Sequence, residues 1–248
     1  MTDPTPQPVF VLVRPQMGEN IGAAARAMAN FGLGRMRLVA PRDGWPNPKA
    51  VAMASGAGRL QDDAQVYDTT AEAIADCTHV YATTARPRGL IKSVVTPERA
   101  MAETAEKLGQ GGQVAVLFGP ERAGLENEDI ARATAIISVP VDPAFPSLNL
   151  AQCALLTAYE WRRQAVPAVP ERMEYAGSDP ATAVEVEKLG DHYEQRLGQA
   201  GFFFPEDKAA HMKQNLRNLW SRLPLTRADV QILHGVLRQM VRWKERGD

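Results

Sequence analysis

The sequence predicts an α/β domain with a mostly parallel sheet, followed by a smaller all-α domain. Over residues 1–165, short apolar runs rich in β-branched residues alternate with helical patterns, and this alternation is typical of parallel sheets covered by helices. Beyond residue 181 the strand-like runs stop and three helical patterns follow. Residues 166–180 contain three prolines, which indicates a linker. We therefore predict domains at 1–165 and 181–248, joined by this linker.

The individual elements follow from apolar periodicity and from the residues that begin and end each pattern. Strands are predicted at residues 9–13, 36–40, 64–67, 78–82, 114–118 and 135–139. Helices are predicted at residues 20–31, 47–55, 70–77, 97–108 and 149–165, then at 183–197, 205–223 and 226–244. In the last helix, helical spacing predicts a core stripe made of Val230, Leu233, Leu237, Met240 and Val241.

The first predicted helix contains two polar residues of interest, Asn20 and Arg26. Asn20 is a suitable N-cap, and Gly32 is a suitable end to the helix. Arg26 lies about 140° around the helix from Ile21, which belongs to the apolar face. Helical side chains lean towards the N-terminus, so the guanidinium would reach back towards the loop before the helix. Arg26 is therefore either a solvated residue or part of a functional site.

Three predicted strands end in loops that could bind a ligand. Gly119 follows the strand at 114–118, a proline-rich loop follows the strand at 135–139, and TTARPRG follows the strand at 78–82. Open parallel sheets bind ligands beyond the carboxyl ends of their strands. Ordinary strand-to-helix punctuation is the alternative for each loop. Arg86 and Arg88 in the third loop are either phosphate ligands or part of a solvated basic loop.

Composition argues against several classes of protein. The sequence has no run of 18 apolar residues and no signal-peptide pattern at its N-terminus, so a cytoplasmic protein is expected. Two cysteines and four scattered histidines give no metal-ligand spacing, so no metal is predicted, and Cys153 is expected in the core. No G-x-G-x-x-G follows a strand and no G-x-x-x-x-G-K-[ST] occurs, which argues against dinucleotide dehydrogenases and P-loop NTPases.

Charge is segregated in the C-terminal part of the chain, although the net charge is only −1. Residues 171–207 carry three Lys or Arg against nine Asp or Glu, and residues 208–248 carry nine against three. The basic residues at helical spacing are Lys208, Lys213, Arg217 and Arg222 on one helix and His234, Arg238, Arg242 and Arg246 on the next. They form either a solvated surface or a surface that binds a nucleic-acid backbone.

Three stretches together resemble the SpoU branch of the SPOUT class of RNA methyltransferases. They are ENIGAAARA at 19–27, LFGPERAGL at 117–125 and ISVPVDPAFPSLNLA at 137–151, which match the three signature motifs of that branch in order and spacing. The stretches YEQRLGQAGFF and NLRNLWSRLPLTRADVQILHGVL are similar to the helical extension of bacterial tRNA (cytidine/uridine-2'-O)-methyltransferases, which modify nucleotide 32 in the anticodon loop. The resemblance therefore covers nearly the whole chain.

The resemblance implies a trefoil-knotted methyltransferase domain, S-adenosylmethionine as cofactor, tRNA as partner and a homodimer whose active site lies near the subunit interface. By motif, the cofactor pocket would consist of Thr83, Thr84, Ala85, Gly119, Val139, Pro146, Ser147, Leu148 and Asn149. The catalytic group would be Arg26, with Asn20 and Glu121 as its polar partners. From the basic loop and the basic helix stripes described above, the predicted RNA ligands are Arg86, Arg88, Lys213, Arg217, Arg238 and Arg242. Phe145 stands where relatives often carry Tyr, which removes one hydroxyl contact.

The implied reaction is methylation of the ribose 2'-hydroxyl of cytidine or uridine at position 32 of tRNA. A guanidinium stays protonated near neutral pH and is a poor base, so we expect Arg26 to clamp a phosphate and stabilise the developing alkoxide. A titrating arginine base is the alternative. Other possible functions are methylation of a different tRNA or rRNA nucleotide and non-catalytic RNA binding by the same fold.

Overall fold

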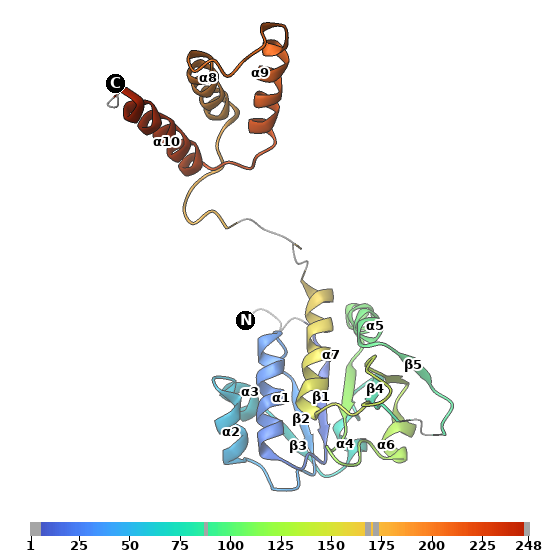
Figure 1. Cartoon of the computed structure of the whole chain (residues 1–248). Coiled ribbons are helices and arrows are strands. Elements are labelled where there is room, and N and C mark those ends of the chain that lie inside the picture. Colours follow the sequence, from blue (N-terminus) through green and yellow to red (C-terminus); the bar gives the residue numbers. More distant parts are fainter. Residues whose placement is uncertain (1–5, 87–88, 167–169, 171–173, 246–248) are drawn as a thin grey trace. The chain divides into compact units, whose positions relative to one another are not determined.

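The computed structural model describes residues 6–86, 89–166, 170 and 174–245, and the chain divides into two compact units, Met1–Ala168 and Val169–Asp248. Figure 1 shows the first unit as a sheet covered by helices and the second as a group of three helices. Arg88, a predicted RNA ligand, lies outside the described residues. Within the described part of the chain, no helix is both long enough and apolar enough to cross a membrane.

The first unit is built on a seven-stranded sheet whose neighbouring strands all run parallel. In spatial order the strands are β3 (Gln65–Tyr67), β2 (Met36–Val39), β1 (Val9–Val13), β6 (Val114–Phe118), β4 (His79–Thr83), β7 (Ala135–Ile137) and β5 (Ser93–Val95). The six predicted strands are confirmed, although β7 ends at Ile137 and leaves Val139 in the following loop. The edge strand β5 was missed because it has three residues, two of them exposed.

Seven helices of this unit are described (Figure 1). They are α1 (Gly18–Asn30), α2 (Pro48–Ala54), α3 (Gly58–Asp62), α4 (Thr70–Ala73), α5 (Pro97–Gly109), α6 (Asn127–Arg132) and α7 (Leu150–Ala165). The short helix α3 was not predicted, and α6 is the short helix to which the loop after β6 leads. The prediction of Asn20 as an N-cap is wrong, because α1 begins at Gly18 with Met17 at its N-cap position. Asn20 therefore lies in the first turn, where its side chain is free for a tertiary contact.

Gly18, just before the first motif, and Gly22, within it, allow α1 to approach α2 closely. A Cβ atom on Gly22 would lie 2.2 Å from the carbonyl oxygen of Ala50, and one on Gly18 would lie 2.3 Å from Asn47 Oδ1. Atoms cannot pack at these distances, so no larger residue fits at either position without moving α2. The motif thus fixes the position of α1, the helix that carries Asn20 and Arg26.

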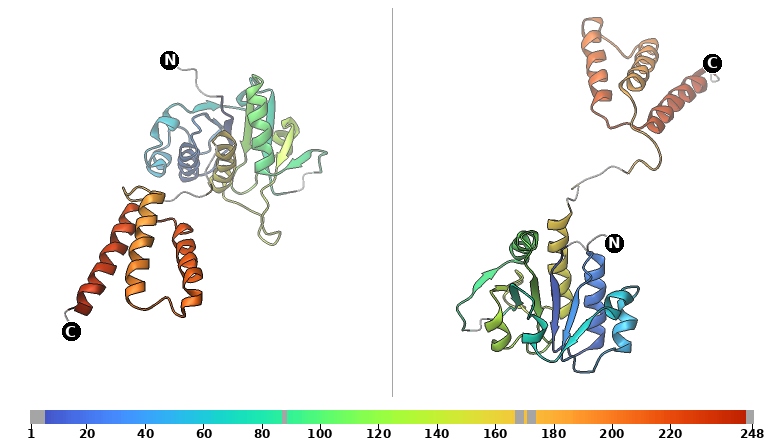
Figure 2. Two further views of the ribbon diagram at one scale, coloured as in Figure 1. Left: turned by 90° about the horizontal axis from the view of Figure 1, so that it is seen from above. Right: turned by 180° about the vertical axis from the view of Figure 1, so that it is seen from behind.

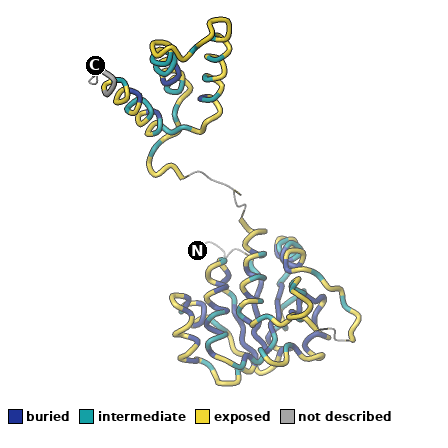
Figure 3. The backbone as a smooth tube through the Cα atoms, viewed as in Figure 1, coloured by how far each residue is buried: buried dark blue, intermediate teal, exposed yellow. Residues whose placement is uncertain are grey.

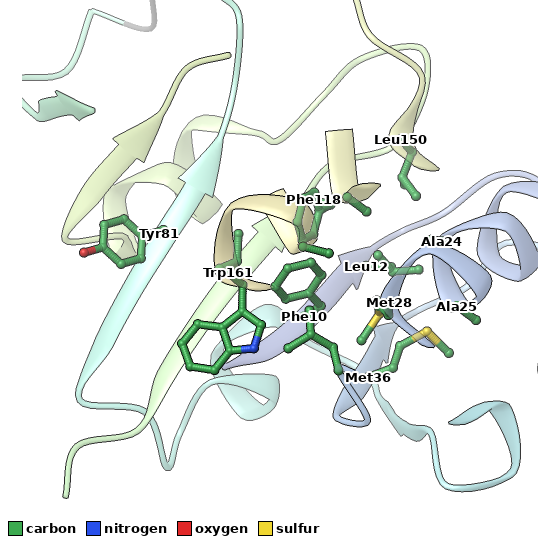
Figure 4. Packing of buried hydrophobic residues seen from close by; sticks show 14 of the residues in the cluster. Phe10, Leu12, Ala24, Ala25, Met28, Met36, Tyr81, Phe118, Leu150 and Trp161 are labelled. Atoms are coloured by element: carbon green, nitrogen blue, oxygen red, sulfur yellow. The ribbon is translucent and has the colours of Figure 1, made fainter. Parts of the chain in front are cut away.

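The sheet separates two apolar layers, because alternate residues of a strand point to opposite faces. Phe10 and Leu12 of β1 pack with residues of α1, α5 and α7, whereas Val9, Val11 and Val13 pack with residues of α4 and α6. Figure 4 shows the first layer, in which the rings of Phe10 and Phe118 lie 4.9 Å apart between centroids. This layer holds β1 and β6 side by side at the centre of the sheet.

The second unit consists of α8 (Ala183–Gln199), α9 (Glu206–Ser221) and α10 (Arg227–Glu245). Figure 2 shows α8 between α9 and α10. Among its described residues, Leu189, Trp220 and Val230 form a buried cluster, with half-buried neighbours around them. Figure 3 shows the contrast with the first unit, where burial follows the strands. The prediction that Met240 belongs to the core stripe is wrong, because Met240 is 64% exposed. The helix α10 packs chiefly against α8 along one face.

Candidate active site

A cavity of about 200 Å³ lies beyond the carboxyl ends of β4, β6 and β7. Its walls come from the loops after these three strands and from the loop that leads into α7. Among the predicted cofactor residues, those that line the cavity are Thr83, Thr84, Ala85, Gly119, Val139, Pro146, Ser147 and Leu148. Asn149 does not line it. The structure thus brings together at one edge of the sheet residues that are far apart in the sequence.

Hydrogen bonds fix the loop after β4. The Thr83 hydroxyl donates to the carbonyl of Leu117 in β6 (2.9 Å), and the Thr84 amide donates to the carbonyl of Ile137 in β7 (3.2 Å). The Thr84 hydroxyl then accepts from the amide of Arg86 (3.1 Å). The loop is therefore anchored to both neighbouring strands, and its start is rigid without a ligand.

Gly119 is required by its own loop. A Cβ atom at this position would lie 2.2 Å from the amide nitrogen of Leu125 and 2.5 Å from the carbonyl carbon of Gly124. Gly124 itself has a φ of +66°, and its amide donates to the carbonyl of Pro120 (2.8 Å). The two glycines let the loop turn back on itself after β6, and this turn places Glu121 at the cavity wall.

A chain of hydrogen bonds joins the three motifs. Glu121 accepts from the Asn20 side-chain amide (2.7 Å) and from the amide of Gln16 (2.9 Å). The Asn20 carbonyl oxygen accepts from the side-chain amide of Asn149 (3.0 Å), whose own oxygen accepts from the amides of Ala151 and Gln152 at the start of α7 (2.8 and 3.4 Å). A carboxylate only accepts and helix N-terminal amides only donate, so both asparagines can have one orientation alone.

These hydrogen bonds give Asn149 a different role from the predicted one in the cofactor pocket. It caps α7 and connects that helix to α1 through Asn20, instead of lining the cavity. It therefore positions the Pro146–Leu148 wall relative to α1. Asn20 and Glu121 are bonded to each other, but neither bonds to Arg26 within the described chain.

Arg26 lies on the exposed side of α1. In the described part of the chain its guanidinium makes no hydrogen bond and no ion pair, and it does not line the cavity of its own chain. The neighbours Ala24, Ala25, Ala27 and Met28 are buried, so the helix presents the guanidinium outwards from an anchored backbone. The predicted meeting of Arg26 with the cofactor pocket is thus not formed within one chain.

Two arginines line the cavity and are exposed. Arg86 was predicted as an RNA ligand, and Arg122 was missed, although it follows Glu121 directly in the second motif. Other lining residues, which were not among the predicted site residues, are Phe118, Pro120, Gly124, Ile137, Leu150 and Cys153. Burial raises the pKa of the Cys153 thiol to about 11, so the thiol is protonated near neutral pH and is not a nucleophile.

The predicted RNA ligands of the helical unit differ in how free their charges are. Arg217 pairs with Asp191 and Glu194 of α8, both at 2.7 Å, so its charge is neutralised inside the unit. Lys213 lies with Nζ 5.3 Å from the ring centroid of Phe203. Arg238 and Arg242 are exposed, and Arg238 Nε donates to the carbonyl of His234 (3.3 Å). Binding of RNA by Lys213, Arg238 and Arg242 stays a prediction. Of the four residues, Arg217 is the least suitable RNA ligand, because its charge is already paired.

The parallel sheet and the three joined motifs define a methyltransferase of the SpoU type. The model of the SpoU rRNA Methylase family matches residues 7–159, and the model of the C-terminal domain of the tRNA methyltransferase TrmJ matches residues 184–248. Because the two matches cover both units, the chain belongs to the TrmJ family of SpoU methyltransferases.

The relatives extend over both units of the chain. The tRNA (cytidine/uridine/adenosine-2'-O-)-methyltransferase TrmJ of Pseudomonas aeruginosa is 38% identical over 92% of this chain and 91% of the relative. The tRNA (cytidine/uridine-2'-O-)-methyltransferase TrmJ of Klebsiella pneumoniae is 35% identical, with 92% and 93% covered. The crystal structure of TrmJ from Z. mobilis ZM4 has 50% identity and a TM-score of 0.80, and the match covers 94% of this chain and 99% of that one.

The methyl donor of this enzyme is S-adenosylmethionine, and the cavity has the chemistry to hold it. Ile137, Val139 and Leu148 provide an apolar surface for a purine ring. Among the described residues that line the cavity, Glu121 is the only acid, and a carboxylate favours a cationic sulfonium nearby. The cavity is smaller than the roughly 300 Å³ of common ligand pockets, so we expect the exposed loop 140–149 to adjust when the cofactor binds.

Proposed function

We propose that the chain methylates the ribose 2'-hydroxyl of cytidine or uridine at position 32 of the tRNA anticodon loop. The observation that carries the proposal is the hydrogen-bonded connection of the cavity to α1, the helix that bears Arg26. The names of the relatives support a tRNA ribose as the substrate, and the helical unit supports a long RNA partner. The position within the anticodon loop rests on the resemblance of the C-terminal stretches.

The cofactor supplies the methyl group, and the chain supplies position and charge. Arg86 and Arg122 at the cavity rim bind the phosphates next to the target nucleotide, because guanidinium groups bind phosphate oxygens in pairs. Arg26 holds the target phosphate and stabilises the negative charge that grows on the 2'-oxygen. The proton leaves to water, since a guanidinium does not accept it near neutral pH. Fixing the reactants in line contributes about 7–11 kcal/mol in favourable cases.

The proposal includes a homodimer in which Arg26 of one subunit acts at the cavity of the other. Three apolar side chains, Leu155 and Tyr159 of α7 and Val166 just after its end, are 37–46% exposed. Tyr159 also meets Phe31, at the end of α1, edge to face with centroids 5.8 Å apart. A second copy that covers this face would bury these side chains and bring a second α1 close to the site. We also propose that the loops beyond β6 and β7 form the trefoil knot of the family.

The position of methylation can be read directly. The purified enzyme, S-adenosylmethionine and tRNA transcripts with C, U or A at position 32 should give 2'-O-methylation at that nucleotide for C and U. A transcript with 2'-deoxyribose at position 32 is the matched control and should accept no methyl group. Methylation at another nucleotide of tRNA, or only of rRNA, would support the alternative targets. Adenosine is included because the two relatives differ in that base.

Mixed dimers test the shared site. A chain with Arg26→Ala keeps its cavity, and a chain with Leu148→Glu keeps Arg26 but loses the apolar wall of the cavity. Neither variant should methylate tRNA alone. If Arg26 acts across the dimer, an equal mixture after subunit exchange should recover about a quarter of the wild-type activity, since about half of the dimers are mixed and each has one complete site. No recovery, with exchange confirmed by mass, would place Arg26 at its own cavity.

A non-catalytic RNA-binding role is the second candidate. The hydrogen bonds that connect Glu121, Asn20 and Asn149 argue against a role in binding alone. They join the cavity wall to α1, and a surface that only binds RNA does not need this connection. The transcript assay separates the two functions. Tight tRNA binding without methylation of any nucleotide would support the binding role.

A further inference from the structure

The helices α8 and α10 run parallel with a constant offset. Glu185 pairs with Arg227 (3.2 Å), and His192 Nδ1 lies 2.8 Å from His234 Nδ1; both contacts join residues 42 positions apart. The two imidazole rings are stacked, with centroids 5.1 Å apart and an angle of 28° between their planes. One helical turn further along, the same offset places Arg238 opposite Arg196. We call these four residues, His192, His234, Arg196 and Arg238, the α8–α10 seam.

The charge balance changes along the contact between the two helices. Glu185 neutralises Arg227 at its start, but no carboxylate is among the groups that act on His192. Burial lowers the pKa of His192, and His234, Arg196 and Arg238 lower it further. Arg196 Nη1 donates to Gln199 (3.1 Å), whereas Arg196 Nε is buried without a hydrogen-bond partner. Basic groups thus face each other without a counter-charge.

Two acidic residues of α8 form ion pairs with α9, the other helix that packs against α8. Asp191 and Glu194 both pair with Arg217 of α9, so they are not available to the seam. Like charges that face each other across two helices repel, and a buried guanidinium N–H without a partner costs about 1–3 kcal/mol. An anion between the helices would remove both penalties. Its oxygens would accept from the guanidinium groups in charge-assisted hydrogen bonds.

We propose that the α8–α10 seam binds a backbone phosphate of the RNA substrate through His192, His234, Arg196 and Arg238. The inference rests on the proposed function for the identity of the partner, and it names where on the helical unit that partner is held. It adds His192, His234 and Arg196 to the RNA ligands and retains Arg238. It excludes Arg217, whose charge is already satisfied by two carboxylates.

The histidines make this contact sensitive to pH. A bound phosphate favours protonated imidazole, so binding raises the pKa of His192 above its value in the free protein. Affinity for RNA is therefore greatest at low pH and falls as the pH rises through the bound-state pKa. The groups that face His192 are Arg196 on its own helix and His234 and Arg238 on α10, with the neutral Glu185–Arg227 pair at the start of the contact.

The test is tRNA binding by the full-length protein across a salt series at constant pH. The variant Arg196→Gln/Arg238→Gln should bind tRNA more weakly, and the slope of log affinity against log salt should fall by about one for each phosphate that the variant no longer neutralises. Arg59→Gln is the control. Arg59 lies on α3 of the first unit, its side chain is 95% exposed, and it has no part in the proposed RNA contacts, so removal of its charge should leave the slope nearly unchanged. S-adenosylmethionine affinity should not change in any variant.

A second variant keeps the test clear of folding effects. His192→Gln/His234→Gln removes both imidazoles and should flatten the change of tRNA affinity between pH 6 and pH 8. An unchanged salt slope in the double arginine variant, or an equal fall of the slope in Arg59→Gln, would overturn the proposal. The proposed methylation is judged separately, because binding is measured without turnover: a chain that methylates no tRNA can still show or lack phosphate binding at the seam.

Discussion

The polar side chains that matter for function are satisfied differently in the two units. In the first unit, hydrogen bonds connect Glu121, Asn20 and Asn149 in series, beside an apolar layer that includes Phe10, Phe118 and Trp161. The helical unit has a cluster of three buried residues and leaves Arg196 Nε without a partner. The difference indicates that hydrogen bonds within the first unit hold the polar side chains beside the cavity in place, whereas the helical unit has a buried donor that is open to a ligand.

The largest effect is expected from removing a side chain of the apolar layer beneath the cavity. Phe118 is 1% exposed, packs against Phe10 and also lines the cavity, so Phe118→Ala should destabilise the first unit by about 3–5 kcal/mol and weaken cofactor binding. Urea unfolding followed through S-adenosylmethionine binding measures it. Phe145→Ala is the control, because Phe145 is 78% exposed and its loss should change stability little. Equal effects of the two would contradict the proposed architecture.

The next effect is on the hydrogen-bond chain. Asn20→Asp places a carboxylate against Glu121, where the present contact is 2.7 Å. The repulsion should raise the activation free energy for kcat/KM by about 2–3 kcal/mol, which lowers kcat/KM roughly 30- to 150-fold. Adding Glu121→Gln supplies an amide that donates to the new carboxylate and should restore most of the activity, although it lowers activity when made alone. Asn30→Asp adds the same charge to the exposed end of α1 and is the control. Additive losses in the double variant would show that the two residues act independently.

A smaller effect concerns an ion pair remote from the cavity. Arg37 is 7% exposed and donates to both oxygens of Asp76 (2.6 and 2.7 Å), which holds the pKa of that carboxyl well below its usual range. Asp76→Asn should cost about 1–3 kcal/mol at pH 7 because the buried guanidinium loses its partner. A lowered pKa in the folded state stabilises above the unfolded pKa, so the wild type should lose this advantage as the pH falls through the acidic range. A difference between the two proteins that does not depend on pH would contradict this account.

The smallest effect is expected in the helical unit. Met240→Gln should change its stability by less than about 0.5 kcal/mol, because the side chain is 64% exposed. A core position, as periodicity predicted, would cost about 2 kcal/mol or more. Leu237→Gln, at a buried position on the same helix, is the matched comparison and should unfold the unit. Thermal unfolding followed by the helical circular dichroism signal distinguishes them, and similar losses would return Met240 to the core.

The fold could be predicted where the sequence pattern is local. The strands β1 and β6 are buried at all five positions, and such short continuous apolar runs can be recognised as buried strands from the sequence. The strand β5 could not be found, because SVV at a sheet edge is half exposed and has no periodicity to detect. The end of β7 was set two residues too late, since the apolar run continues into the loop that lines the cavity.

The site could be predicted only where the motifs carry it. Periodicity indicated loops beyond the strands, and the resemblance supplied the residues that line the cavity. The place of Asn20 depends on Glu121, about a hundred residues away, so a helix pattern cannot separate a cap from a first-turn residue. Likewise, the basic stripe of the last helix gave no sign that His234 meets His192 of α8 or that Arg217 is neutralised, because both depend on the packing of separate helices.

Arg26 decides the central claim, which is that the first unit binds the cofactor at the strand ends while Arg26 acts in the methyl transfer. The measurement is calorimetric binding of S-adenosylmethionine together with single-turnover methylation of tRNA, for Arg26→Ala and the wild type. We predict a cofactor affinity within about twofold of the wild type and no detectable methyl transfer, because Arg26 does not line the cavity of its own chain. Loss of cofactor affinity, or methylation at the wild-type rate, would contradict the claim.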